Sequence, residues 1–405
     1  MNKNIKLAVA GAVLALSATA ANAGIIIPAG DWTVDIGGNM NAFMTNHDVK
    51  TRTADGVKTN PSDVNSFGTG LLPAALGIGA KTRQNDLDVE FNFTFWTGTS
   101  SGENVGNGGA AGNNSLNIRQ AYLTFGDKSW GSVKMGRDLG VFGSDAILSD
   151  MTLLGVGTGG PAGGSSTLGR IGSGYIYADW KGQFQYSSPN FNGFQVTAAV
   201  TENFRPTGTV GAPNASYGGD PVTTTKKNDM AYEGKVTYDF TGNDVSGRIW
   251  ASGITQKTEY TDGTDNYTSR GLDIGAKAAV GAFGLVGYYY DGRGLDSQAS
   301  LLQGLFNGNG VKSKDSGGYV QGTFAVPGIK TKLGLSYGEN NSKHNATGFD
   351  IENKSWIIGA YHPLTKHLNL VAEYTNQDVK NRDAAGDEVR KTERDTVSLG
   401  AILFF

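Results

Sequence analysis

The residues best able to carry out chemistry are few in this chain of 405 residues. Cysteine is absent, which excludes thiolate nucleophiles and cysteine-ligated zinc or iron–sulfur clusters. No H-E-x-x-H pattern and no visible serine–histidine–carboxylate set involves the four histidines, which are His47, His344, His362 and His367. His362 and His367 flank a short predicted turn, where turn polarity explains them better than metal ligation does. The sequence therefore predicts no catalytic residue, no metal site and no enzyme.

A glycine-rich stretch, Gly155-Val-Gly-Thr-Gly-Gly160, matches the G-x-G-x-x-G pattern of dinucleotide sites. Such a site needs a strand before the glycines and a helix directly after them. Here Pro161-Ala-Gly-Gly-Ser-Ser follows, which is typical of a loop. We therefore expect no dinucleotide and no other cofactor.

Charged side chains offer a second kind of chemistry, the electrostatic selection of solutes along an aqueous passage. The net charge is −3, without the basic excess that a nucleic-acid-binding face requires, so no nucleic-acid partner is predicted. Which acids and bases could select solutes depends on the elements that position them.

The elements have a period of two residues. Within residues 31–45 the even positions are apolar and the odd positions polar, and residues 87–96 alternate in the same way. A strand sends successive side chains to opposite faces, so each segment has one apolar and one polar face. Fourteen further segments of this kind follow as far as Phe405, giving about sixteen strands.

Many such strands, each about ten residues long and aromatic-rich on the apolar side, are typical of a transmembrane barrel. Short and long connections alternate, and four of the long ones are residues 46–74, 140–178, 338–353 and 376–395. Because no unpaired sheet edge can face lipid, the sheet must close. The predicted fold class is all-β, a closed antiparallel transmembrane β-barrel of about sixteen strands.

The first residues are predicted to be a secretory signal peptide. Lys3 and Lys6 precede an apolar run, and Ala21-Asn-Ala23 forms a small-residue cleavage site. The run is too short to span a bilayer as a helix. We expect residues 1–23 to be the signal peptide and residues 24–405 to form one barrel domain, exported to the outer membrane of a Gram-negative cell.

Several motifs resemble the trimeric general-diffusion porins of Gram-negative bacteria. They are Arg119-Gln-Ala-Tyr-Leu-Thr-Phe, Gly131-Ser-Val-Lys-Met-Gly-Arg, Gly140-Val-Phe-Gly-Ser-Asp-Ala-Ile-Leu-Ser-Asp-Met151 and Gln185-Tyr-Ser-Ser-Pro-Asn-Phe-Asn-Gly-Phe. The resemblance implies an inward-folded third loop, a homotrimer, and contact with membrane lipid and lipopolysaccharide. It also implies passive diffusion of ions and small hydrophilic solutes.

The same resemblance implies which residues surround the pore constriction. Asp150 and Asp145 match the acids of the third loop, and Arg119 matches an arginine of the facing wall. Three further bases fall on the polar parity of their strands, namely Lys81, Arg83 and Lys134. The parity that places Arg119 in the lumen also assigns Leu116, Ile118 and Tyr122 to the lipid-facing set.

Two departures from the family pattern leave the charge selectivity open. Thr152-Leu-Leu-Gly follows the Asp-Met pair where the family often has P-E-F-G-G, and Asn39 stands where a base is common. A substrate-selective channel, with Tyr288, Tyr289 and Tyr290 as an aromatic track, is the alternative within transport. A structural adhesin barrel and an outer-membrane enzyme are more distant alternatives.

Overall fold

The structure is a computed structural model. It describes residues 24–56, 58–99, 116–159, 166–203, 230–242, 244–259, 266–295, 312–344 and 349–405. The predicted signal peptide lies outside these ranges. In the described part of the chain, no helix is long and apolar enough to cross a membrane.

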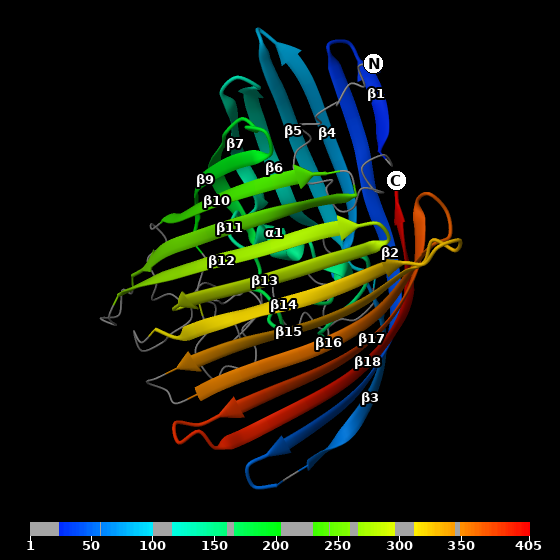
Figure 1. Cartoon of the computed structure of the whole chain (residues 1–405), viewed down its shortest axis with the longest axis vertical. Helices are drawn as coiled ribbons and strands as arrows, with labels where there is room; N and C mark the ends of the chain where they lie inside the picture. Colours follow the sequence, from blue (N-terminus) through cyan, green and yellow to red (C-terminus); the bar gives the residue numbers. More distant parts are fainter. Residues whose placement is uncertain are drawn as a thin grey trace.

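The described residues form one antiparallel sheet. Its strands are β1 (Ile25–Ala29), β2 (Trp32–Thr53), β3 (Lys58–Gly68), β4 (Ala74–Gln84), β5 (Leu87–Thr97), β6 (Asn117–Asp127), β7 (Gly131–Leu139), β8 (Trp180–Ser187), β9 (Phe194–Glu202), β10 (Met230–Thr241), β11 (Val245–Thr258), β12 (Tyr267–Val280), β13 (Phe283–Arg293), β14 (Lys314–Ala325), β15 (Lys332–His344), β16 (Phe349–Pro363), β17 (Leu368–Arg382) and β18 (Glu388–Phe404). From β4 to β18 each strand pairs with the next one along the chain (Figure 1).

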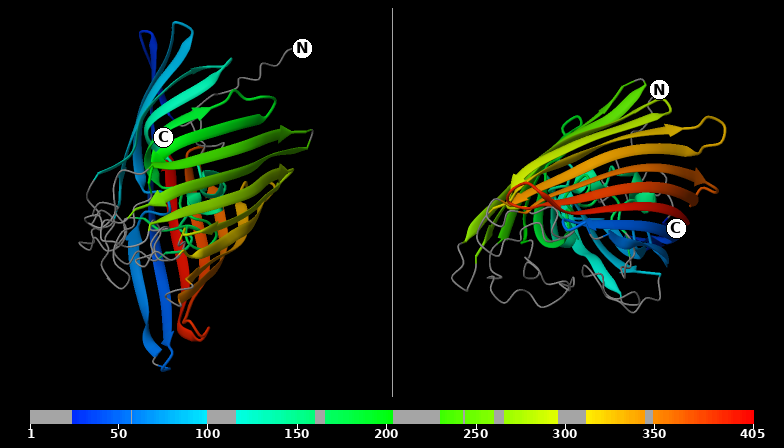
Figure 2. Two further views of the ribbon diagram at one scale, coloured as in Figure 1. Left: turned by 90° about the vertical axis from the view of Figure 1, so that its left-hand side faces the viewer. Right: turned by 90° about the horizontal axis from the view of Figure 1, so that it is seen from below.

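The sheet closes on itself through β2. One edge of β2 pairs with β18, from Asn39 opposite Phe404 to Thr53 opposite Arg390, and then with the short β1. Its other edge pairs with β4 near the start of the strand and with β3 near its end. Strands β2 and β4–β18 therefore make a closed ring of sixteen, which confirms the predicted fold class. The hairpin of β2 and β3 extends beyond most of the other strands (Figure 2).

Alternation along each strand sorts the side chains into two environments. In β13, Tyr288 and Tyr290 are buried whereas Tyr289 is 53% exposed, and in β12 the exposed Leu272 is two residues from Ile274, also exposed. The exposed set is apolar through the middle of the strands, as expected of a face in contact with hydrocarbon. The other set is rich in Asn, Gln, Ser, Thr and charged residues and faces the enclosed side. The predicted tyrosine track is therefore split between the two faces.

Several long connections predicted from the sequence were too long. Residues 46–74 were expected to be a polar loop, but β2 continues to Thr53 and returns as β3. Likewise, β15 continues to His344 inside the predicted loop 338–353. In the predicted loop 376–395, β17 continues to Arg382 and β18 begins at Glu388. Beyond the apolar zone the outward positions of these strands are charged or amide residues, so the apolar alternation used to find strands disappears while the hydrogen-bonded ladder continues.

Candidate functional site

Among the connections that the structure describes, one differs in its contacts. It joins β7 to β8 and contains the short helix α1 (Ser144–Ile147) and the 3₁₀ turn η2 (Met151–Leu154). We call its described residues, 140–159 and 166–179, the internal segment. It contacts the inward face of strands from β10 to β17, and α1 lies behind β11 and β12 in Figure 1.

The segment begins against a wall carboxylate. Glu233 on β10 accepts hydrogen bonds at Oε2 from the backbone N–H groups of Val141 (2.7 Å) and Phe142 (2.8 Å). Its Oε1 accepts from Nζ of Lys181 at 2.6 Å and from the hydroxyl of Thr201 at 3.1 Å. The buried acid thus holds the polypeptide backbone and is compensated by a cation of the same wall.

A second wall carboxylate holds the segment farther along. Oε2 of Glu373 on β17 accepts from the N–H groups of Val156 and Gly157, both at 2.8 Å, and Oε1 accepts from the hydroxyl of Tyr361 at 2.7 Å. Between these two anchors, Gln321 on β14 accepts from the N–H of Met151 at 2.8 Å. The wall therefore holds the backbone of the segment at points on both sides of the enclosed space.

Side chains of the segment also bond to the wall, and Arg170 is one of them. Arg170 is 0% exposed. Its Nε donates to Oγ of Ser336 on β15 at 2.6 Å, and Nη1 donates to Oγ of Ser355 on β16 at 3.0 Å. Asn353 on β16 adds a bond from its side-chain amide to the carbonyl of Gly172 at 2.7 Å.

Asp150, predicted as a constriction acid, is directed into the segment itself and is 3% exposed. Its Oδ1 accepts from the N–H of Thr152 at 2.9 Å and so caps η2. Oδ2 accepts from the hydroxyl of Tyr175 at 2.8 Å and from the N–H of Arg170 at 3.2 Å. The carboxylate therefore joins the two halves of the segment.

Asp145, the second predicted acid, is also 3% exposed but faces the wall beside it. It forms ion pairs with Nζ of Lys235 on β10 at 2.7 Å and with Nη1 of Arg248 on β11 at 3.0 Å. Burial opposes ionisation of Asp145, but the charges of Lys235 and Arg248 outweigh burial and keep its pKa below the ordinary value. Lys277 on β12 lies directly opposite Arg248, so Asp145 faces a cluster of wall cations.

The predicted wall bases lie on β4, β6 and β7, outside the strands that anchor the segment. Arg119 lies at a bulge between β5 and β6, with its guanidinium 5.2 Å from the ring centre of Trp96. Lys134 on β7 pairs with Asp138 and lies 4.7 Å from the ring centre of Tyr122. Tyr122 is thus on the inward face, contrary to the parity prediction, because the bulge changes which residues share a face.

Lys81 and Arg83 lie two residues apart on β4 and differ in their partners. Lys81 is exposed on the inward face and lies directly opposite Glu90 of β5. Arg83 lies next to the short turn and pairs with Asp88 at 2.8 Å and Asp127 at 2.9 Å. The structure therefore places Arg83 at the rim rather than beside the internal segment.

Sequence reasoning did not find the anchoring residues. Besides Glu233 and Glu373 they include Asp273 on β12, whose Oδ2 accepts from the N–H of Gly143 at 3.1 Å. Each is an ordinary acid on an alternating strand, and the backbone groups they bind leave no signal in the sequence. Alternation along their strands is consistent with an inward position for all three. An acid among inward small polar residues was the available clue, because a buried charge needs partners.

The partly exposed side chains of the segment are of mixed character. They include Leu148, Leu154 and Leu168, but also Ser149, Ser166 and the terminal Asp179, whereas Asp145 and Asp150 are buried. A second short stretch, residues 69–73, packs against it, because the N–H of Leu71 donates to the carbonyl of Gly155 at 2.9 Å. Among the described charged residues of the segment, only Asp179 at its junction with β8 is partly exposed, so most charged groups open to the enclosed space come from the wall.

Gly157 allows a test of how tightly the segment is held. Its φ is +64°, and a Cβ would lie 2.5 Å from the backbone of Gly169. We expect Gly157→Ala to displace the segment from Glu373, giving a noisier conductance and a lower heat-dissociation temperature in gel-mobility assays. The control is Gly56→Ala, which has a similar φ of +76° but no atom within 4 Å, so it incurs only the backbone penalty of about 1–2 kcal/mol. Equal behaviour of the two variants would contradict a tightly packed segment.

Known proteins with the same architecture are channels. The family model described as Gram-negative porin matches residues 8–382. The outer membrane channel DcaP of Acinetobacter baumannii is similar in structure, with a TM-score of 0.66 and 18% identity, covering 95% of this chain and 100% of that one. An anion-selective porin from Comamonas acidovorans has a TM-score of 0.59 and 17% identity, with 92% and 100% covered. The trimer form of OmpT from Vibrio cholerae has a TM-score of 0.53 and 14% identity, with 92% and 99% covered.

No curated protein sequence matches the chain. A closed sixteen-stranded barrel with an apolar exterior and a polar interior defines a transmembrane β-barrel channel. The chain belongs to the Gram-negative porin family and is an outer-membrane diffusion channel. Among the described residues, no cluster of three or more His, Asp or Glu could hold a metal ion.

Proposed function

We propose that solutes pass between the internal segment and the wall formed by β4–β7, and that this passage is the constriction. The supporting observation is that the segment is anchored to other strands, β10, β14 and β17, through Glu233, Gln321 and Glu373. In a ring of sixteen strands, β5 and β6 lie across from β13 and β14. The space is thus bounded on one side by the segment, with Leu148, Leu154 and Leu168 partly exposed, and on the other by charged wall residues.

The proposed wall of the passage carries charges of both signs. Lys81 and Lys134 supply positive charge, and Glu90 and Asp138 lie beside them. Arg119 adds a further cation near the long-loop end of β6. Such a wall orders water and interacts with ions of either sign, which suits passive diffusion of ions and small hydrophilic solutes. We assign no catalytic role to any residue.

The proposal includes the surroundings of the barrel. We infer that the chain assembles as a homotrimer, as the trimer form of OmpT does, and that its outer face contacts membrane lipid and lipopolysaccharide. In planar bilayers, insertion of the protein is expected to raise conductance in groups of three equal steps. Single isolated steps would contradict a trimer, and an inserted barrel without conductance would contradict the channel.

The absence of cysteine makes the passage easy to probe. In Lys81→Cys, the single thiol should react with a negatively charged methanethiosulfonate, replacing a positive group by a negative one. We expect lower conductance to anions and a reversal potential shifted toward cation selectivity in a salt gradient. The matched control is Lys366→Cys, exposed in the turn before β17, which should react without changing either quantity. No effect at Lys81 would place the passage elsewhere.

A further inference from the structure

A row of four bases crosses neighbouring strands on the outward face of the barrel. Arg270 of β12 lies directly opposite Arg293 of β13, which lies opposite Lys314 of β14, and Lys314 lies opposite Lys343 of β15. We call these four residues the basic row. With strands about 4.8 Å apart, the row spans roughly 14 Å.

Their orientation follows from alternation along each strand. Arg270 has the parity of the exposed Leu272, and Arg293 has that of Tyr289. Lys314 has the parity of the exposed Val320, and Lys343 has that of Leu335. All four bases are exposed, so the row faces away from the pore.

The basic row lacks the compensation found elsewhere on the barrel. None of the four bases forms an ion pair with another residue in the ranges that the structure describes. Asp291, two residues from Arg293, and Asp350, opposite Lys343, are the nearby acids on the same face. Like charges directly opposite each other in a sheet are destabilising, so a row of four is a cost that an anionic partner would remove.

The height of the row indicates where that partner is. Arg270 is near the start of β12 and Arg293 is at the end of β13, on the side of the long connections. In outer-membrane barrels this is the extracellular side. Leu272, 71% exposed, is only two residues from Arg270, so the lipid-facing band begins about 7 Å below the row. The bases therefore lie at the height of the outer-leaflet headgroups.

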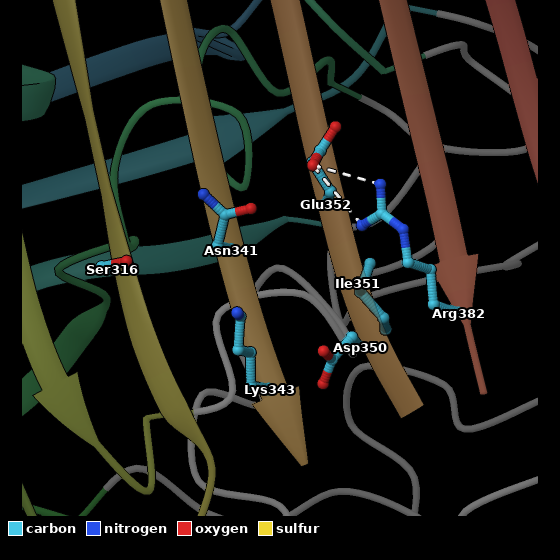
Figure 3. Close-up of a pocket in the computed structure, with 7 residues that line it drawn as sticks. All are labelled: Ser316, Asn341, Lys343, Asp350, Ile351, Glu352 and Arg382. Carbon is cyan, nitrogen blue, oxygen red and sulfur yellow. Dashed lines mark hydrogen bonds and ion pairs between the residues drawn. The ribbon is translucent and has the colours of Figure 1, made fainter. Parts of the chain in front are cut away.

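A polar cavity lies at one end of the row. It has a volume of about 400 Å³ and is lined by Ser316, Asn341, Lys343, Asp350, Ile351, Glu352 and Arg382 (Figure 3). Apart from Ile351, these residues have the outward parity of their strands. Arg382 and Glu352 interact at 3.5 Å, whereas Lys343 extends from the neighbouring strand. Amide, hydroxyl and charged groups of this kind suit the hydroxyls of a sugar.

We propose that the basic row and this cavity bind the phosphorylated sugar headgroup of lipopolysaccharide. The phosphates would lie on the four bases, the sugar in the cavity, and the acyl chains against Leu272, Tyr289 and Val320. This inference deepens the proposed contact with lipopolysaccharide and rests on it. It assigns that contact to β12–β17.

The test compares lipid binding by the purified, folded full-length barrel with that of two double variants. Arg293→Gln with Lys314→Gln removes the centre of the row. Lys128→Gln with Lys366→Gln removes the same charge from exposed positions at the short-turn end. Native mass spectrometry in detergent is used to titrate each protein with bis-phosphorylated lipid A, with lipid A stripped of phosphate, and with inorganic pyrophosphate.

We expect the wild type and the short-turn variant to bind bis-phosphorylated lipid A equally. Each cation at the height of the headgroups raises the affinity for an anionic lipid about fivefold, so the row variant, which lacks two, should bind about 25-fold more weakly. Unchanged binding by the row variant, or equal binding of lipid A stripped of phosphate, would overturn the proposal. Pyrophosphate binding as tight as that of lipid A would indicate a site for soluble anions and would overturn it as well.

Conductance separates this inference from the proposed function. The row variant should conduct like the wild type in phosphatidylcholine bilayers, because its substitutions face away from the pore. A wild type that conducts but binds lipid A no better than the row variant would refute the headgroup site alone. A wild type without conductance would refute the channel proposal, whatever its lipid binding.

Discussion

Replacing Glu373 with alanine is expected to release the far end of the internal segment and enlarge the pore. The carboxylate is buried and accepts three hydrogen bonds, from Val156, Gly157 and Tyr361. Each donor left without a partner costs about 1–3 kcal/mol, so the anchored position of the segment should no longer be favoured. The expected result is a larger and noisier single-channel conductance and faster swelling of liposomes in large sugars.

Two companion variants define the cause. Glu373→Gln keeps an oxygen for the two backbone donors and should fall between the wild type and Glu373→Ala in conductance and noise. Glu339→Ala removes an outward-facing acid that accepts from Asn341 at 2.7 Å and from the hydroxyl of Tyr337 at 3.0 Å, and it should leave the pore unchanged. A quiet, wild-type conductance in Glu373→Ala would show that this anchor does not position the segment.

Replacing Asp145 with asparagine is expected to shift the channel toward anions. The substitution removes the negative charge that pairs with Lys235 and Arg248, while Lys277 adds a third cation opposite Arg248. Loss of this negative charge leaves the three wall cations less compensated and makes the net charge of the lumen more positive by one. Charges in the lumen dominate ion selectivity. The reversal potential in a potassium chloride gradient should therefore move in the anion-selective direction.

Asp150→Asn is the matched control, since it removes the same charge from the same segment. Asp150 is bound only within the segment in the contacts described above, so the reversal potential should stay constant. The amide would, however, place donors against the N–H of Arg170 and the hydroxyl of Tyr175. The expected effect is a lower heat-dissociation temperature. A larger selectivity shift in Asp150→Asn than in Asp145→Asn would reverse the assignment.

The lowered pKa of Asp145 also predicts a dependence on pH. A carboxyl group with a depressed pKa stabilises the folded state above its unfolded pKa and loses that contribution as pH falls through its folded pKa. The ion pairs of Asp145 should therefore persist when pH is lowered from 7 to about 5, close above the ordinary aspartate range. The difference in reversal potential between the wild type and Asp145→Asn should be constant across this interval.

Much of the barrel could be predicted from alternation, because a strand between lipid and water must repeat every two residues. The alternation around Met40 and Phe93 identified their strands and lipid-facing sides correctly. The prediction failed in the charged half of β2, where apolar and polar residues no longer alternate. It also failed at the bulge beside Gln120, which places Tyr122 on the inward face.

The candidate site was less accessible to prediction. Resemblance identified the segment that carries Asp145 and Asp150, but the direction of a side chain in an irregular segment depends on tertiary contacts. Asp150 is directed into the segment by its hydrogen bond from Tyr175, which lies twenty-five residues later. Asp145 is directed toward the wall by bases on two strands distant in the sequence. Whether these residues border the passage stays a prediction.

The anchors on the wall bind main-chain N–H groups, which every residue except proline possesses. Side chains of the internal segment can therefore change while its backbone N–H groups stay bound to Glu233 and Glu373. Leu148 and Leu154, at the accessible edge, could be exchanged for polar or bulky residues without touching Glu233 or Glu373. The same barrel could in this way evolve, or be engineered, to admit different solutes with little loss of stability.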